Sequence, residues 1–210
     1  MRFNCVKTAI ISMAFVLLAA STCVAASNGF QDMGGHWAEV YVSALSEKGL
    51  ISGMPDGLFH PNEEMTFPQF VTIIVTIGYG KQEPVDSYWA SGYMKTALEN
   101  GLIDSDDMEK LEDITRFDAA RLISNALDNI LEEEALDDIM SVPDFADFTD
   151  CRLCQTTYNY ARICRAKGIV TGRPSPDGLV FDGSDNLTRA EGCIMIMRML
   201  EPELRTPLEP

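Results

Sequence analysis

Apolar residues recur at helical spacing in three stretches of the chain, and each stretch ends at a glycine. In all three a tyrosine lies eight residues before the glycine and an apolar pair follows it. A glycine after such a run is typical of a helix that ends in a left-handed residue. The pattern predicts helices ending at Gly49, Gly101 and Gly168. The stretches are YVSALSEKGLISG, YMKTALENGLID and YARICRAKGIVTG.

A second apolar run follows each of these helices after a loop, and each run begins with a threonine. Thr188 with Glu191 has the form of a capping box, and Thr66 with Gln69 has the equivalent spacing and residue types. Thr115 is followed by Asp118, a weaker variant. The runs MTFPQFVTII, ITRFDAARLI and LTRAEGCIMI are apolar on more than one face, which predicts buried helices.

The same order of features therefore occurs three times, as helix, loop and helix. A unit of about 50 residues cannot bury such helices alone, so we expect the three units to share one core. The repeats are predicted at residues 28–80, 81–131 and 147–201, with an acidic connector at 132–146 and a tail at 202–210.

The first 26 residues have the pattern of a secretory signal peptide. Arg2 and Lys7 form a basic start, an apolar run of twelve covers residues 9–20, and small residues follow. Cleavage before Ser27 fits best, and cleavage after Ala25 also fits. Acylation of Cys23 is an alternative. The pattern predicts an exported protein, and no other apolar run is long enough to span a membrane.

The chain is strongly acidic, with a formal net charge of −16. The predicted signal peptide carries two basic residues and no acids, so its removal changes the charge to −18. Such a surface repels phosphates, and this argues against nucleic-acid binding.

Four cysteines remain after the signal peptide. The C-x-x-C pair is compatible with a zinc or redox site, but no second pair of this spacing follows and no histidine is near. Disulfides or buried thiols are the favoured interpretation for an exported chain, and pairing of the last two stays open. The four are Cys151, Cys154, Cys164 and Cys193.

The segments FQDMGGHWA, GLISGMPDGLFHPNEEMT and LTRAE resemble S-layer homology domains, and the resemblance extends from about Phe30 to Leu200. It implies an all-α fold of three helix-loop-helix repeats with pseudo-threefold symmetry, whose second helices meet in a central bundle. It also implies noncovalent binding of a secreted protein to a cell-wall glycan, often a pyruvylated secondary polysaccharide, and a location at the cell surface.

The resemblance implies a set of ligand-binding residues in grooves between the repeats. The arginine of the T-R-A-E motif, the acid of the F-x-D motif and the tryptophan are carried over position by position. An arginine at the first turn of a helix suits a carboxylate, and a tryptophan either stacks on a sugar or packs between repeats. Phe67 replaces the arginine in the first copy, so we expect at most two full grooves. The residues are Arg116, Arg189, Asp32, Asp150, Trp37 and Trp89.

The acidic charge also favours another ligand, peptidoglycan that carries cationic groups. A protein–protein adaptor or a self-assembling envelope component is a further alternative, because the chain shows no cargo domain beyond the repeats. The methionines Met195, Met197 and Met199 suit either a partner surface or a core.

Catalysis finds no support in the sequence. His36 and His60 are the only histidines, and both fall within the repeat motif. The acidic run Asp104–Asp107 lacks the glycine and the terminal glutamate of a calcium loop. We therefore expect no enzyme activity, no cofactor and no metal site.

Overall fold

The computed structural model describes residues 29–149 and 154–206, and within them the fold is all-α, as predicted. The predicted signal peptide, with Cys23, lies outside the described residues. Six α-helices are accompanied by one small hairpin, which the sequence did not predict. They are α1 (Glu39–Glu47), α2 (Phe67–Tyr79), α3 (Ser91–Glu99), α4 (Arg116–Asn129), α5 (Gln155–Ala166), α6 (Arg189–Leu200), β1 (Arg173–Ser175) and β2 (Gly178–Val180). Short 3-10 turns are η1 (Gln31–Met33), η2 (Ser105–Glu109), η3 (Ile139–Ser141) and η5 (Pro202–Leu204).

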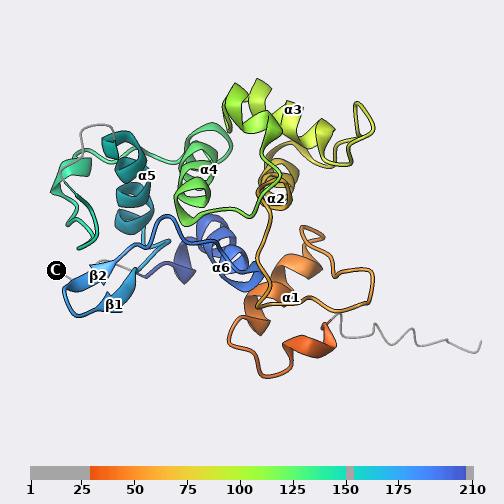
Figure 1. The fold of residues 1–210 in the computed structure, drawn as a ribbon, viewed down its shortest axis with the longest axis horizontal. Coiled ribbons are helices and arrows are strands. Elements are labelled where there is room, and N and C mark those ends of the chain that lie inside the picture. The colour runs from red at the N-terminus through yellow and green to blue at the C-terminus, as the bar shows by residue number, and fades with distance from the viewer. Residues whose placement is uncertain (1–28, 150–153, 207–210) are drawn as a thin grey trace, which may run out of the picture.

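The helices form an inner and an outer set (Figure 1). The second helices of the units, α2, α4 and α6, lie toward the middle, and α1, α3 and α5 lie outside them. Each outer helix packs on the inner helix of the preceding unit: α3 on α2, α5 on α4, and α1 on α6. The contact between α1 and α6 joins the first unit to the last. The three units therefore interlock in a closed ring.

Backbone hydrogen bonds just before the inner helices repeat this cyclic order. The amide of Met65 donates to the carbonyl of Leu187 (2.9 Å), that of Leu187 to Ile114 (2.9 Å), and that of Ile114 to Met65 (2.8 Å). Each unit thus donates to one neighbour and accepts from the other. This closed triangle is direct structural support for the predicted pseudo-threefold arrangement.

The predicted helix ends are confirmed by their local geometry. Thr66 and Thr188 both form complete capping boxes, with Gln69 and Glu191 respectively. Thr115 accepts from the amide of its third helical residue, but no complete capping box forms there. The three glycines have φ of +69°, +67° and +69°, a region in which a side chain is strained. They are Gly49, Gly101 and Gly168.

The inner helices supply much of the shared core. Met195, Met197 and Met199 of α6 are between 1% and 4% exposed, so these methionines fill the core and offer no partner surface. Cys164 and Cys193 are buried free thiols, so they do not pair with each other. Cys154 is disulfide-bonded, and Cys151 lies outside the described residues.

None of the described helices is long and apolar enough to cross a bilayer.

Residues of the predicted connector and tail both contact the third unit. Phe145, near the end of the predicted connector, stacks on Phe181 with ring centroids 5.3 Å apart. In the predicted tail, the amide of Thr206 donates to the carbonyl of Gly168 (2.9 Å). Arg205 forms an ion pair with Glu133. Arg205 and Thr206 therefore both contact the rest of the fold.

Candidate functional site

A hollow of about 230 Å³ lies where residues of all three units meet. We call it the first groove, because the first unit forms most of its wall. Arg189 comes from the third unit and Trp89 from the second. The first unit contributes the turn after α1 and one side of α2, namely Leu50, Ile51, Ser52, Gly53, Met54, Phe59, Met65, Gln69, Thr72 and Ile73.

A second hollow, of about 170 Å³, has an equivalent construction. We call it the third groove, because the third unit forms most of its wall. Here Arg116 comes from the second unit and Trp37 from the first. The third unit contributes Ile169, Val170, Thr171, Gly172, Arg173, Glu191, Ile194, Met195 and Arg198.

The two grooves follow one cyclic rule. One unit supplies the turn and the inner helix, the unit before it supplies the arginine, and the unit after it supplies the tryptophan. No unit holds all the parts of a groove. The ring must close for the first groove to exist, because Arg189 reaches the first unit from the last.

Both arginines are fixed in the same way. The Nε of Arg189 donates to the carbonyl of Phe59 (2.8 Å), and that of Arg116 to the carbonyl of Phe181 (2.7 Å). Each guanidinium lies over the ring of the same phenylalanine, 4.5 Å and 5.2 Å from its centroid. The residues are only 6% and 7% exposed, and burial lowers both pKa values. Arginine nevertheless stays protonated at neutral pH, so each groove holds a buried cation.

The two tryptophans are open to solvent, at 57% exposed for Trp37 and 50% for Trp89. Each lines a groove, beside Arg116 and Arg189 respectively. An exposed indole ring next to a buried cation offers an apolar face and a charge to the same ligand. The structure therefore brings together four of the six predicted residues, in two arginine–tryptophan pairs.

Asp32 has another environment. Its carboxylate accepts the amides of Phe59 (3.0 Å) and His60 (2.6 Å). Burial alone would raise the pKa of Asp32, but these two amides outweigh it, and the pKa is lowered. Asp32 is not among the residues lining either groove. It holds the loop whose carbonyl receives Arg189.

The third unit has an equivalent acid, Asp147, which accepts the amides of Phe181 (2.8 Å) and Asp182 (2.9 Å). The predicted counterpart was Asp150, which lies outside the described residues. Both acids end an F-x-D triplet, in FADF and FTD, so the motif alone could not distinguish them. The geometry assigns Asp147 as the counterpart of Asp32.

The second unit has no equivalent arginine–tryptophan pair. By the cyclic rule, its groove would take Phe67 from the first unit and Thr156 from the third. Thr156 lies twelve residues before Gly168, the position that tryptophan has in the other two units. Phe67 is 1% exposed, and the ammonium of Lys110 lies 5.1 Å from its ring centroid. Phe67 is therefore packed in the core and supplies no charge at this position.

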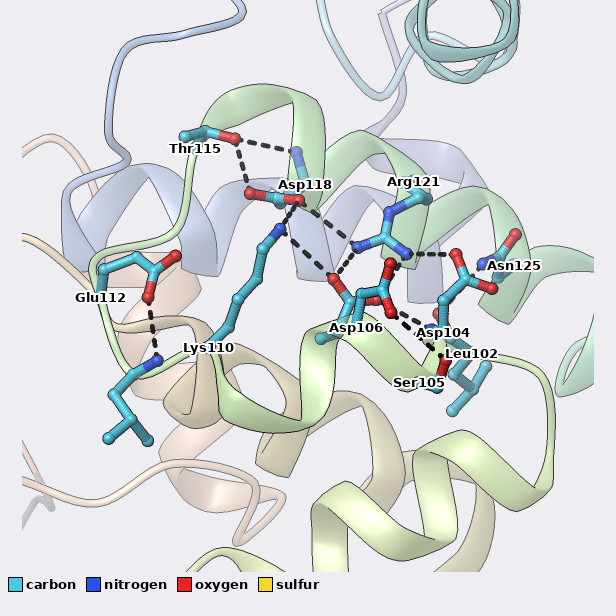
Figure 2. A network of polar contacts seen from close by, with 12 residues as sticks. Leu102, Asp104, Ser105, Asp106, Lys110, Glu112, Thr115, Asp118, Arg121 and Asn125 are labelled. Atoms are coloured by element: carbon cyan, nitrogen blue, oxygen red, sulfur yellow. Dashed lines mark hydrogen bonds and ion pairs between the residues drawn. The ribbon is translucent and has the colours of Figure 1, made fainter.

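Ion pairs occupy the corresponding region of the second unit (Figure 2). Arg121 forms two hydrogen bonds of 2.8 Å with the buried carboxylate of Asp107 and a contact of 3.4 Å with Asp118. Lys110 contacts Asp118 at 2.9 Å. Asp118 and Arg121 are the positional equivalents of Gln69 and Thr72, which line the first groove. Internal pairing therefore satisfies the charges that would face a ligand here.

Sequence reasoning missed Arg173 and assigned Gln69 and Glu191 to helix capping alone. Both capping residues also line a groove. Arg173 follows Gly172, just as Met54 follows Gly53 in the first unit. An alignment of the units on these second glycines would have indicated it.

Comparison with known proteins gives the class of the first unit. The family model of the S-layer homology domain matches residues 29–71. Residues 29–71 therefore match the S-layer homology domain, and the second and third units repeat the helix-loop-helix architecture of the first. The resemblance noted from the sequence is confirmed.

The relatives are much longer proteins. The chain is 24% identical over 182 residues to an amylopullulanase of Thermoanaerobacterium thermosulfurigenes, covering 82% of this chain and 9% of the relative. It is 36% identical over 91 residues to cell surface glycoprotein 1 of Acetivibrio thermocellus, covering 39% and 4%. It is 29% identical over 126 residues to S-layer protein EA1 of Bacillus anthracis, covering 54% and 14%. The predicted location at the cell surface agrees with relatives of these kinds.

Proposed function

We propose that this chain binds an acidic cell-wall glycan without a covalent bond and thereby holds itself at the cell surface. The observation that carries the proposal is the first groove. Within it the buried Arg189 guanidinium and the half-exposed ring of Trp89 line one open hollow. Such a pair suits a sugar that bears a carboxylate, for which a pyruvyl ketal is the specific proposal.

The relatives support a role at the cell surface, but we assign none of their activities to this chain. The chain covers 9% of the amylopullulanase and 14% of the S-layer protein, so it corresponds to a module of each. The grooves contain binding groups, a cation and an aromatic face, and we assign them no catalytic role.

Peptidoglycan with cationic groups is the second candidate ligand. The formal charge of −16 favours it, because an acidic surface attracts a cationic polymer and repels an acidic one. The two candidates predict opposite effects of the groove arginines. An acidic glycan needs their charge, and a cationic ligand does not.

Cosedimentation of the mature protein with sacculi tests the proposal. Native sacculi are compared with sacculi from which acid has removed the secondary polysaccharide, using the unchanged protein and Arg189→Ala. Trp89→Ala tests the aromatic face, and Val40→Ala, at a position 76% exposed on α1, is the matched surface control.

Loss of cosedimentation on stripping and with Arg189→Ala, but not with Val40→Ala, supports the acidic glycan. Binding that survives both changes assigns the ligand to the peptidoglycan. If the unchanged protein binds neither preparation, the glycan proposal is wrong, and the adaptor interpretation takes its place.

A further inference from the structure

The first and third grooves differ in charge at two equivalent positions of their lining. Where the first groove has Met54 and Gln69, the third has Arg173 and Glu191. Gln69 and Glu191 are both the third residue of an inner helix and both complete a capping box. One groove therefore has an amide where the other has a carboxylate.

In the third groove this carboxylate already forms ion pairs with two arginines. Oε1 of Glu191 lies 2.9 Å from Nη2 of Arg173 and 3.9 Å from Nη1 of Arg116. Burial alone would raise the pKa of Glu191, but the Thr188 amide and Arg173 outweigh it, and the pKa is lowered. Glu191 is therefore ionised at neutral pH and stands where a ligand's carboxylate would have to bind.

Further acids pair with Arg173, whereas Arg198, the third arginine lining this groove, donates to the carbonyl of Ile169 (3.1 Å) and has no carboxylate partner among the described residues. Arg173 also pairs with Asp185 at 2.8 Å and with Asp182 at 3.4 Å. An incoming anion would have to separate these pairs and would meet the repulsion of Glu191.

The first groove has no such internal anion. Among the residues that the structure describes, none places a carboxylate within 4.0 Å of the Arg189 guanidinium. Its hydrogen bonds go to the backbone carbonyls of Phe59 and Ser52. Thr72 lines the same groove, and its buried hydroxyl has no partner in the described part of the chain. Its equivalent in the third groove is Ile194. A buried cation without a counter-charge and an unpaired buried hydroxyl are both costly, and a polar ligand would satisfy them.

We propose that the first groove alone accepts the anionic group of the ligand, and that Glu191, which contacts both Arg116 and Arg173, repels that group from the third groove. The apolar side chains of Met54 and Ile73 in the first groove favour a carboxylate that carries a small apolar substituent, such as the methyl group of a pyruvyl ketal. This inference rests on the proposed function and narrows it from two grooves to one.

Reciprocal exchange of the two capping residues tests the inference. The probe is a methyl glycoside that carries a pyruvyl ketal, titrated calorimetrically into the mature protein, with its methyl ester as the uncharged control ligand. We expect one site per chain and no binding of the ester. Gln69→Glu should weaken binding at least tenfold, and Glu191→Gln should create a second site.

Both exchanges keep the capping box, because glutamate and glutamine both serve at the third helical position. Val40→Ala, at a position 76% exposed and outside both grooves, is the control variant and should bind within about threefold of the unchanged protein. Arg189→Ala should abolish binding, and its loss of affinity should be far larger than that of Arg116→Ala. Thermal melts identify any variant that has lost its fold.

Two sites in the unchanged protein, or equal losses with Arg116→Ala and Arg189→Ala, would overturn the inference. So would unchanged affinity in Gln69→Glu. If the protein sediments with native sacculi but does not bind the glycoside, the inference fails while the proposed function stands. If it binds neither, both fail.

Discussion

Arg189 and Phe59 lie 130 residues apart in the chain, yet the Nε of the arginine donates to the phenylalanine carbonyl at 2.8 Å. The guanidinium also lies 4.5 Å from the centroid of the same ring. This contact joins the last unit to the first and simultaneously places a cation in the first groove. Closure of the ring and assembly of the binding site are therefore one structural event.

Shortening a side chain on the closing helix should destabilise the whole ring. Leu45 of α1 is fully buried, and α1 packs on α6. Leu45→Ala should lower the free energy of unfolding by about 2–5 kcal/mol, because it leaves a cavity. Val40→Ala, on an exposed position of α1, should change it by less than about 0.5 kcal/mol. Urea unfolding followed by circular dichroism measures both, and two separate transitions would contradict an interlocked ring.

The ion pairs of the second unit should make stability depend on pH. Burial alone would raise the pKa of Asp107, but its bonds to Arg121, with further contributions from the Asp104 backbone and Lys110, outweigh this, and the pKa falls below its ordinary value of 3.8. A lowered pKa means that the ionised carboxylate stabilises the fold above pH 4, and that this contribution is lost as the pH falls through the folded pKa.

Asp107→Asn should therefore cost about 1–3 kcal/mol at pH 7, because it removes charge-assisted hydrogen bonds to Arg121. The difference from the unchanged protein should shrink progressively below pH 4. Urea unfolding of both proteins between pH 3 and pH 7 provides the measurement. A difference that stays constant with pH would show that the charge of Asp107 contributes nothing.

The two free thiols should be inert in the folded protein. Burial raises the pKa of Cys164 and of Cys193 to about 12, so almost no thiolate forms near neutral pH. Alkylation with iodoacetamide at pH 8 should leave both unmodified, and the same treatment in denaturant should modify both. Mass spectrometry of the peptides reads out each residue. Rapid labelling of either thiol without denaturant would contradict its burial.

Two glycines that end outer helices provide a matched pair. Gly49 and Gly168 both have φ of +69°, but a methyl group at Gly49 meets open space. At Gly168 it would lie 2.3 Å from the carbonyl oxygen of Thr206. Gly49→Ala should cost about 1–2 kcal/mol from backbone strain alone. Gly168→Ala should cost more, because Thr206 must also move.

Thermal unfolding of both alanine variants gives the comparison. Deletion of residues 206–210 should bring the loss in Gly168→Ala closer to that in Gly49→Ala, because the clashing segment is removed. Equal losses in the full-length variants would show that Thr206 does not pack on Gly168.

Local features of this protein were readable from the sequence, because short-range chemistry determines them. A threonine three residues before a glutamine or glutamate predicted the starts of α2 and α6, and Gly49 predicted the end of α1. The repeated order of these features predicted an all-α fold with a shared core. The motif also indicated Arg189 and Trp89 as ligand-binding candidates.

Only the tertiary structure decided how these parts combine. The sequence does not show that a groove takes its arginine and its tryptophan from different units, because that follows from the ring closing through α1 and α6. It also could not show that Gln69 and Glu191 each line a groove with an arginine from another unit. One is an amide beside Arg189 and the other a carboxylate beside Arg116, and the charge balance of each groove depends on contacts between residues far apart in the chain.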